Sequence, residues 1–173
     1  MAYTLYLYKE FPSKSNKTIR LEIFERDYAG SAIELDALSS TPITLTTDNT
    51  NNSVYIPVIK TFLGINIKDT DQIDYTRLFT PDATKFKVIV KVNGTTEWAG
   101  YLTPDSFSQS LQYRSDINLI ARDNLGMLSE FTYTSGNTFG TIRNLINAAM
   151  TVIGFQGTLE YRVKKVDANG TNV

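Results

Sequence analysis

The feature that most constrains the fold is a stretch with an apolar residue at every second position, followed by an Asn-Gly pair. In residues 85–92, Phe or Val occupies each even-numbered position from 86 to 92. This period of two is typical of a β-strand with one buried face and not of a helix. Asn93-Gly94 is the pair preferred in two-residue type I′ turns, which join antiparallel strands. With residues 95–102 as the returning strand, which carries the only tryptophan, Trp98, the sequence predicts a β-hairpin.

The same period recurs along most of the chain. Further strands are expected at residues 3–9, 18–26, 54–59, 62–68, 114–121 and 158–165. Residues 39–53 are rich in Ser, Thr, Asn and Asp, which indicates a loop with one short strand near 43–46. Residues 139–153 instead place apolar side chains at the 3.6-residue period of a helix. The sequence therefore predicts a mainly β fold, an antiparallel β-barrel, split barrel or sandwich, with one amphipathic α-helix near the C-terminus packed on a sheet.

We expect a β-rich domain over residues 1–135. Residues 136–173 are expected to hold the helix and the start of a further hairpin, which either leads into that domain or packs on it. The hairpin is indicated by the turn pair Asn169-Gly170, after which only three residues follow. A hairpin without its returning strand suggests that the chain is the front part of a longer protein.

The amino-acid composition excludes or disfavours several classes of function. The 173 residues include no His and no Cys, and 17 basic against 18 acidic residues give a net charge of −1. The chain therefore lacks Ser-His-Asp and Cys-His catalysis, disulfides and His/Cys zinc sites. A charge near zero disfavours electrostatic binding of nucleic acid, and no apolar run approaches the ~20 residues of a membrane-spanning helix. We expect no enzymatic activity, no cofactor, no nucleic-acid specificity and no membrane span.

Two groups of residues could nevertheless carry chemistry. Asp69, Asp71 and Asp74 form a short acidic loop that could bind a hard cation, but their spacing does not fit an EF-hand, so we expect a solvated turn and no metal. Glu97 beside Trp98 pairs a carboxylate with an aromatic platform, as in many sugar sites. The alternative function is therefore a carbohydrate-binding or adhesin-like β-sandwich module that uses Trp98 and nearby tyrosines. A carboxylate-based hydrolase is a weaker alternative.

Aromatic residues are expected on both faces of the first strand, where Tyr6 and Tyr8 lie opposite the face that carries Tyr3, Leu5 and Leu7. Tyrosine is enriched at protein interfaces because it buries a large rigid ring and still satisfies its hydroxyl. Strands with apolar or aromatic groups on both faces suit a subunit that packs one face in its core and the other against a neighbour. Tyr6 and Tyr8 are therefore interface candidates.

Two motifs extend this interpretation. The first is Trp98-x-Gly100-Tyr101-Leu102-x-Pro104-Asp105, and the second is Asp123-x-Leu125-Gly126-x-Leu128, which precedes the predicted helix. In this order they resemble the N-terminal part of tail or baseplate-hub proteins of tailed bacteriophages and related prophages, especially those of gut Bacteroidetes, crAss-like phages included. The resemblance spans roughly residues 20–160 and is sharpest over 86–155.

The resemblance implies a virion component without catalysis, a scaffold of β-barrel or split-barrel units that join into a homo-oligomeric ring. Such a chain would be made in the cytoplasm of the bacterial host and reside in the tail, with other tail proteins as partners. The tail position stays open between hub, ring and fibre adaptor. The implied structural or interface residues are Trp98, Gly100, Tyr101, Pro104, Asp105, Asp123, Leu125, Gly126 and Leu128. We further expect Gly100 or Gly126 to adopt a positive φ or to lie beneath a packed aromatic ring.

Overall fold

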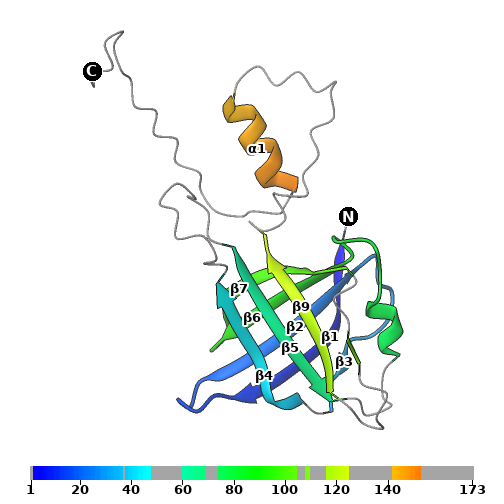
Figure 1. Ribbon diagram of the computed structural model, residues 1–173, viewed down its shortest axis with the longest axis vertical. Helices are drawn as coiled ribbons and strands as arrows, with labels where there is room; N and C mark the ends of the chain where they lie inside the picture. The colour runs from blue at the N-terminus through cyan, green and yellow to red at the C-terminus, as the bar shows by residue number, and fades with distance from the viewer. Residues whose placement is uncertain are drawn as a thin grey trace, which may run out of the picture. The chain divides into compact units, whose positions relative to one another are not determined.

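The strands of the chain form one bent sheet. The computed structural model describes residues 2–36, 38–47, 60–68, 74–104, 108–109, 116–124 and 142–152. Within them the strands are β1 (Tyr3–Pro12), β2 (Thr18–Arg26), β3 (Ile33–Glu34), β4 (Leu38–Thr47), β5 (Thr61–Lys68), β6 (Phe86–Val92), β7 (Thr95–Leu102), β8 (Ser108–Gln109) and β9 (Asp116–Asp123). The helices are η1 (Tyr75–Leu78), of 3₁₀ type, and α1 (Ile142–Val152), as Figure 1 shows. The chain divides into two units, residues 1–127 with the sheet and residues 128–173 with α1.

The strand order in the sheet is β3-β1-β2-β6-β7-β9-β5-β4, and β8 pairs separately with β9. The predicted mainly β fold with a single short helix near the C-terminus is confirmed. As predicted, the strand pairs of the described sheet are antiparallel, apart from β1 and β3, which run parallel over two residue pairs. In the described part of the chain β3 and β4 are the two ends of the order, and the sheet is open rather than a closed barrel.

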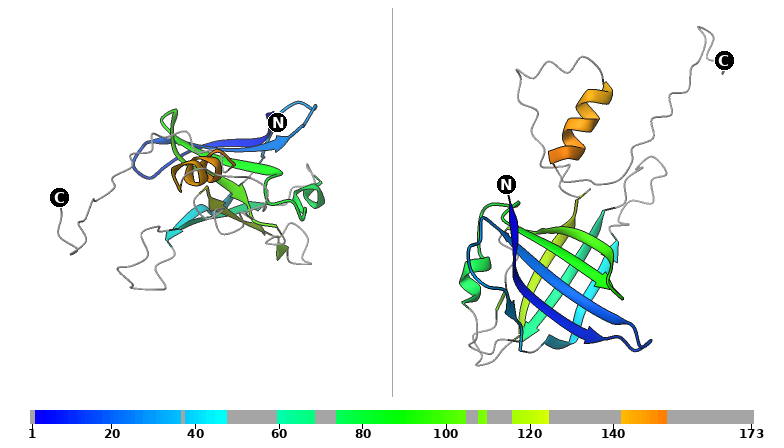
Figure 2. Two further views of the ribbon diagram at one scale, coloured as in Figure 1. Left: turned by 90° about the horizontal axis from the view of Figure 1, so that it is seen from above. Right: turned by 180° about the vertical axis from the view of Figure 1, so that it is seen from behind.

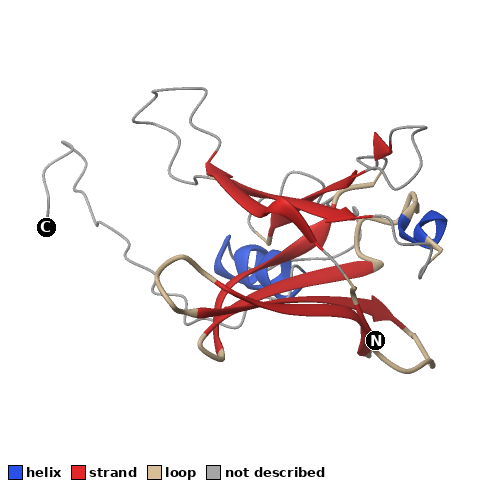
Figure 3. Cartoon of the chain, turned by 90° about the horizontal axis from the view of Figure 1, so that it is seen from below, coloured by secondary structure: helices blue, strands red, loops and turns tan. Residues whose placement is uncertain are grey.

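The sheet bends at β7, so that its two halves face each other. β7 pairs with β6 along most of its length, but it pairs with β9 only through Gly100, Tyr101 and Leu102. Strands β1, β2 and β6 therefore form one layer, and β9, β5 and β4 form the other. The two layers are seen end-on in Figure 2 (left) and in Figure 3. β9 is the strand through which the layer of β4 and β5 joins the rest of the sheet.

The core lies between these layers and is built from alternate residues of each strand. The buried apolar side chains include Leu7, Leu21, Ile23, Phe86, Val88 and Val90 from one layer, and Leu63, Ile65, Ile67, Ile117, Leu119 and Ala121 from the other. Their spacing of two follows from the strand geometry, which points successive side chains to opposite faces. The other residues of the strands form the outer faces of the two layers, and these outer faces differ in chemistry.

The hairpin predicted over residues 85–102 is confirmed as β6 and β7. Asn93 and Gly94 both have positive φ, 50° and 82°, as a type I′ turn requires. Lys91 pairs with Thr96, but Val90 pairs with Trp98, so Glu97 is an extra residue and forms a β-bulge. Without the bulge, Trp98 would lie opposite Ile89 on the outer face. The bulge therefore turns Trp98 towards the core, on the same side as Val90.

Helix α1 lies within the predicted range 139–153, and its packing on a sheet stays a prediction. Ile146, within the apolar stripe, is 39% exposed. The strands expected at 54–59 and 158–165 and the turn expected at Asn169-Gly170 fall outside the described residues. Among the helices that are described, none has the length and hydropathy needed to cross a membrane.

Candidate functional site

Three of the predicted site residues meet where β7 leaves β6 and turns to β9. The Trp98 indole Nε1 donates a hydrogen bond to Thr61 Oγ1 (2.9 Å), and the Thr61 hydroxyl in turn donates to Asp123 Oδ2 (2.7 Å). The Thr61 backbone N–H donates to the same carboxylate oxygen at 2.8 Å. Gly100 pairs directly with Asp123 across the strands. These residues tie β5, β7 and β9 together at the bend of the sheet.

Gly100 lies beneath the Trp98 ring, as predicted for one of the two glycines. A Cβ at this position would clash with the carbonyl oxygen of Arg122 and would lie 2.5 Å from Trp98 Cη2. Trp98 is half-buried and packs against the core, and its N–H is used by Thr61. Its ring therefore fills the bend of the sheet, which does not favour the use of Trp98 as a platform for a sugar.

The other predicted residues that the structure describes are Tyr101, Pro104, Tyr6 and Tyr8. Tyr101 is buried beside Tyr3, with 6.2 Å between ring centroids, and Pro104 follows the end of β7 and is half-buried. Tyr6 lies in the core, although it was expected on the opposite face from Leu7, because a register shift between Leu5 and Leu7 changes the local alternation. Tyr8 lies under the guanidinium of Arg20, 4.8 Å from the ring centre. Asp105, Leu125, Gly126 and Leu128 fall outside the described residues.

A buried carboxylate that the sequence did not reveal anchors η1 to the sheet. Glu25 is 3% exposed, and Arg77 Nε donates to both of its carboxylate oxygens, at 3.0 and 3.3 Å. Lys85 Nζ lies 3.7 Å from the same carboxylate. The Arg77 guanidinium also lies 5.3 Å and 5.2 Å from the ring centres of Tyr6 and Tyr28. The hydrogen bond with Glu25 raises the pKa of Arg77, and this contact holds η1 against the sheet.

One residue of the acidic loop that was weighed as a metal site, Asp74, caps η1. Asp74 Oδ1 accepts hydrogen bonds from the Thr76 hydroxyl and from the Thr76 backbone N–H (3.0 Å), which cap η1 and lower the pKa of the carboxyl. Asp69 and Asp71 lie outside the described residues. Within the ranges that are described, no cluster of three acidic side chains could hold a metal ion.

The outer face of β1, β2 and β6 carries ion pairs. Glu22 is buried although it points away from the core, and its carboxylate lies 2.8 Å from both Arg20 Nε and Lys91 Nζ. Arg20 Nη1 also lies 3.8 Å from Glu10 Oε2, the residue opposite it on β1. Charged side chains on this face therefore pair with one another.

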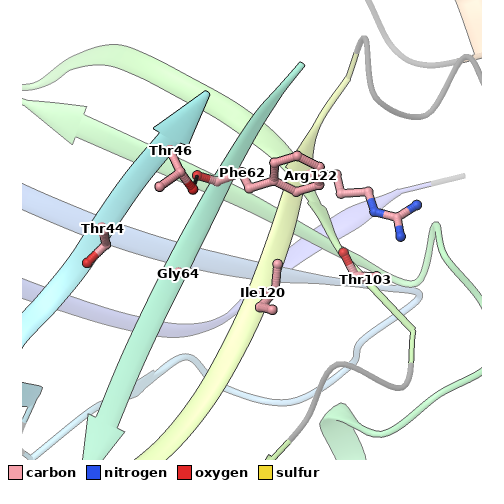
Figure 4. Close-up of a pocket in the computed structure, with 7 residues that line it drawn as sticks. All are labelled: Thr44, Thr46, Phe62, Gly64, Thr103, Ile120 and Arg122. Carbon is pink, nitrogen blue, oxygen red and sulfur yellow. Dashed lines mark hydrogen bonds between the residues drawn. The ribbon is translucent and has the colours of Figure 1, made fainter. Parts of the chain in front are cut away.

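The outer face of β4, β5 and β9 carries an apolar groove instead, shown in Figure 4. Its volume is about 410 Å³, and it is lined by Thr44, Thr46, Phe62, Gly64, Thr103, Ile120 and Arg122. Cross-strand pairing arranges six of these in two rows, Thr44-Gly64-Ile120 and Thr46-Phe62-Arg122. Ile120 is 42% exposed, and Arg122 is the only charged residue in the lining.

Gly64 is the reason for the hollow. It lies in the interior of β5 with regular partners on both sides, so the row through Thr44 and Ile120 has no side chain at its centre. Apart from Arg122, the lining residues that the structure describes are threonine, glycine and apolar residues. The chemistry of this lining suits the binding of an apolar group. We call this surface the Gly64 groove.

Comparison of the chain with models of protein families, with curated proteins and with solved structures finds no match.

Proposed function

We propose that this chain is a non-enzymatic structural component of a phage tail, in the hub, the baseplate or a tail ring, and that it assembles through contacts with copies of itself and with other tail proteins. The single observation that supports this best is the Gly64 groove, an apolar surface on the outside of a sheet whose core is already filled. Contiguous apolar surfaces outside a core mark sites of protein contact. The proposal of a phage tail in particular, rather than of another assembly, comes from the resemblance of residues 86–155 to tail and baseplate-hub proteins.

The edge strand β4 supports the same proposal. Its sequence, Leu-Ser-Ser-Thr-Pro-Ile-Thr-Leu-Thr-Thr, contains no charged residue, and it lies at one end of the strand order. Edge strands are commonly protected from pairing with other chains by charged side chains, Lys above all. Leu45 pairs with the buried Leu63 and yet is 57% exposed, because the sheet ends at β4. An uncharged edge with an exposed leucine suits a subunit whose neighbours cover it.

The experiment that tests the proposal is imaging of the assembled virion by electron cryomicroscopy, together with mass spectrometry of purified particles. We expect the chain in the tail, with an interface of more than about 2,000 Å² in total against neighbouring chains. Absence of the polypeptide from the particle, or its presence as a peripheral knob that touches few chains, would contradict the proposal.

The carbohydrate-binding alternative has its own test, because Trp98 is the only tryptophan. The proposed structural role predicts that a panel of sugars leaves the fluorescence emission of Trp98 unchanged, since its N–H and one ring face are already engaged. A saturable shift of that emission by a sugar would favour the carbohydrate-binding module.

A further inference from the structure

The turn between β6 and β7 is joined to the neighbouring strand β2 through the side chain of Asn93. The Asn93 carboxamide Oδ1 accepts a hydrogen bond from the Thr18 backbone N–H (3.0 Å), and the Asn93 N–H donates to the Thr18 carbonyl oxygen (2.8 Å). Because Ile19 pairs with Val92, these two bonds continue the pairing of β2 with β6 by one step. The carboxamide therefore takes the place of a main-chain carbonyl in the sheet, although Asn93 is exposed.

Asparagine followed by glycine is also a chemically labile pair, because its side-chain amide can be lost without an enzyme. The Gly94 backbone nitrogen gives up its proton and attacks Asn93 Cγ, the Cγ–Nδ2 bond breaks, and ammonia leaves a five-membered succinimide. Water then opens this ring at one of its two carbonyls and gives aspartate or isoaspartate, so that nothing is oxidised or reduced. Glycine favours the attack because no side chain shields its nitrogen, and the space where a Cβ of Gly94 would lie is open.

The folded turn keeps the two reacting atoms apart. Asn93 and Gly94 have the positive φ values of a type I′ turn, in which ψ of the first residue is about +30°. At this ψ the Gly94 nitrogen lies on the side of the Asn93 nitrogen and away from Cβ, whereas ring closure requires it on the side of Cβ. The Thr18 N–H also holds the carboxamide oxygen towards β2. The reaction therefore requires the turn to open.

We propose that Asn93 is a conditional modification site, protected from deamidation while the turn contacts Thr18 and converted when this end of the sheet opens. The inference goes beyond the proposed function and does not depend on it, because it concerns the chemistry of the chain itself. The two products differ in their effect on the fold. Aspartate keeps the main chain and an oxygen for the Thr18 N–H. Isoaspartate adds one carbon to the main chain of a two-residue turn, so that Val92 and Thr95 no longer pair across it.

The first test compares the full chain in its native state with the same sequence outside the fold. The chain and a synthetic peptide of residues 90–97 are incubated in one buffer at neutral pH, and mass spectrometry follows the replacement of the amide by a carboxylate. Trypsin releases residues 92–114 from the chain, and Asn93 is the only asparagine in this peptide. We expect conversion at least about tenfold slower in the native chain, because a protected group reacts only in the locally open fraction. Equal rates would overturn the inference.

The second test removes the hydrogen bond to the carboxamide. Thr18→Pro deletes the N–H at the first residue of β2, a position where a strand tolerates proline, and Thr18→Ala keeps that N–H as the matched control. We expect Asn93 to convert about fivefold faster in Thr18→Pro than in Thr18→Ala, the effect of one hydrogen bond on an opening equilibrium. Thermal unfolding checks that both variants are folded. A folded Thr18→Pro variant that converts no faster than the control would contradict the assigned protection, and the comparison with the peptide does not depend on this variant.

A third test separates the two products. The chain is partly converted in urea and refolded, and an isoaspartyl methyltransferase labels isoaspartate in the folded and misfolded fractions that size-exclusion chromatography separates. We expect isoaspartate to be depleted from the folded fraction, whereas the variant Asn93→Asp, which carries the other product, should refold with the tryptophan emission of the wild type. Isoaspartate at equal levels in both fractions would refute the assigned effect on the hairpin. None of these results bears on whether the chain is present in a virion tail, which the particle itself decides.

Discussion

Trp98 lies over Gly100, two residues further along the same strand and on the same face of it, and no side chain at position 100 could fit beneath the ring. The backbone of Arg122 closes the space from the other side. This relationship fixes where the sheet bends from β7 to β9. It also makes the glycine at this position a steric requirement, in contrast to Gly64.

The first prediction compares these two glycines. Gly100→Ala should lower the free energy of unfolding by at least about 1 kcal/mol, because the new methyl group meets Trp98 and the Arg122 carbonyl. Gly64→Ala should leave stability unchanged or raise it by up to about 1 kcal/mol, because the space is open and the unfolded chain loses freedom. Urea unfolding at neutral pH measures both. Equal effects at the two positions would contradict the assigned difference in packing.

The second prediction concerns the β-bulge. Deletion of Glu97 should remove the bulge and leave Trp98 opposite Val90, on the core side, because Trp98 then follows Thr96 directly in the pairing. We expect the tryptophan emission to stay as in the wild type, since Trp98 can keep its hydrogen bond to Thr61. Deletion of Thr96 and Glu97 together should instead place Trp98 opposite Lys91, on the outer face, and should give a red-shifted emission and a loss of stability. A red shift after the single deletion would contradict the assigned bulge.

The third prediction concerns the buried carboxylate of Glu25. Glu25→Gln should destabilise the protein by about 1–3 kcal/mol, because Arg77 and Lys85 lose a charged partner. Amide hydrogen exchange in Tyr75–Leu78 should accelerate, since the anchor of η1 is weakened. Glu10→Gln is the control, because Glu10 is exposed and lies 3.8 Å from Arg20. Such surface pairs contribute at most about 1 kcal/mol.

The fourth prediction is a pH dependence at Asp82. Partial burial by itself would raise the pKa of Asp82, but hydrogen bonds from Thr84 and the ion pair with Arg26 outweigh it and hold the pKa below its usual value. A carboxyl whose pKa is lower in the folded state stabilises the fold above the unfolded value of about 3.9 and loses this effect as the pH falls through the folded pKa.

Asp82→Asn should therefore be less stable than the wild type at pH 5–8, and the difference should shrink below about pH 4. Urea unfolding of both proteins across this range provides the measurement. A difference that stays constant down to the lowest pH would show that the carboxylate charge is not what stabilises this loop.

The hairpin of β6 and β7 was predictable because neighbouring residues in the sequence determine it. The alternation of apolar and polar residues in 85–92 determines which face of the strand is buried, and Asn93-Gly94 determines the position of the turn. The bulge at Glu97 was not predictable. The sequence Thr-Thr-Glu-Trp-Ala-Gly has no alternation of apolar and polar residues that would show which of its side chains face the core. Residues 39–53 were taken for a loop around a short strand, yet β4 spans Leu38–Thr47, because an edge strand is held by backbone hydrogen bonds and needs little burial.

The candidate sites depended on contacts between distant residues, and these are not visible in one sequence. Glu25 and Arg77 are 52 residues apart, and Thr61 and Trp98 are 37 apart. The motif residues Trp98, Gly100 and Asp123 were identified, but as interface candidates, whereas they meet inside the bend of the sheet. The signal that could have found the groove was Gly64 itself, a glycine within an otherwise regular alternation from Phe62 to Lys68.

The position of β9 also sets the order in which the protein can fold during synthesis. β1, β2, β6 and β7 can pair with one another, and β4 can pair with β5, as soon as these segments leave the ribosome. In the described sheet the two groups are joined through β9, which ends at Asp123. Until that residue emerges, Leu63, Ile65 and Ile67 have no opposing layer held in register, and the nascent chain exposes them. Translation past Asp123 is therefore the event that completes the core, and pauses before it would lengthen the interval in which a chaperone can bind.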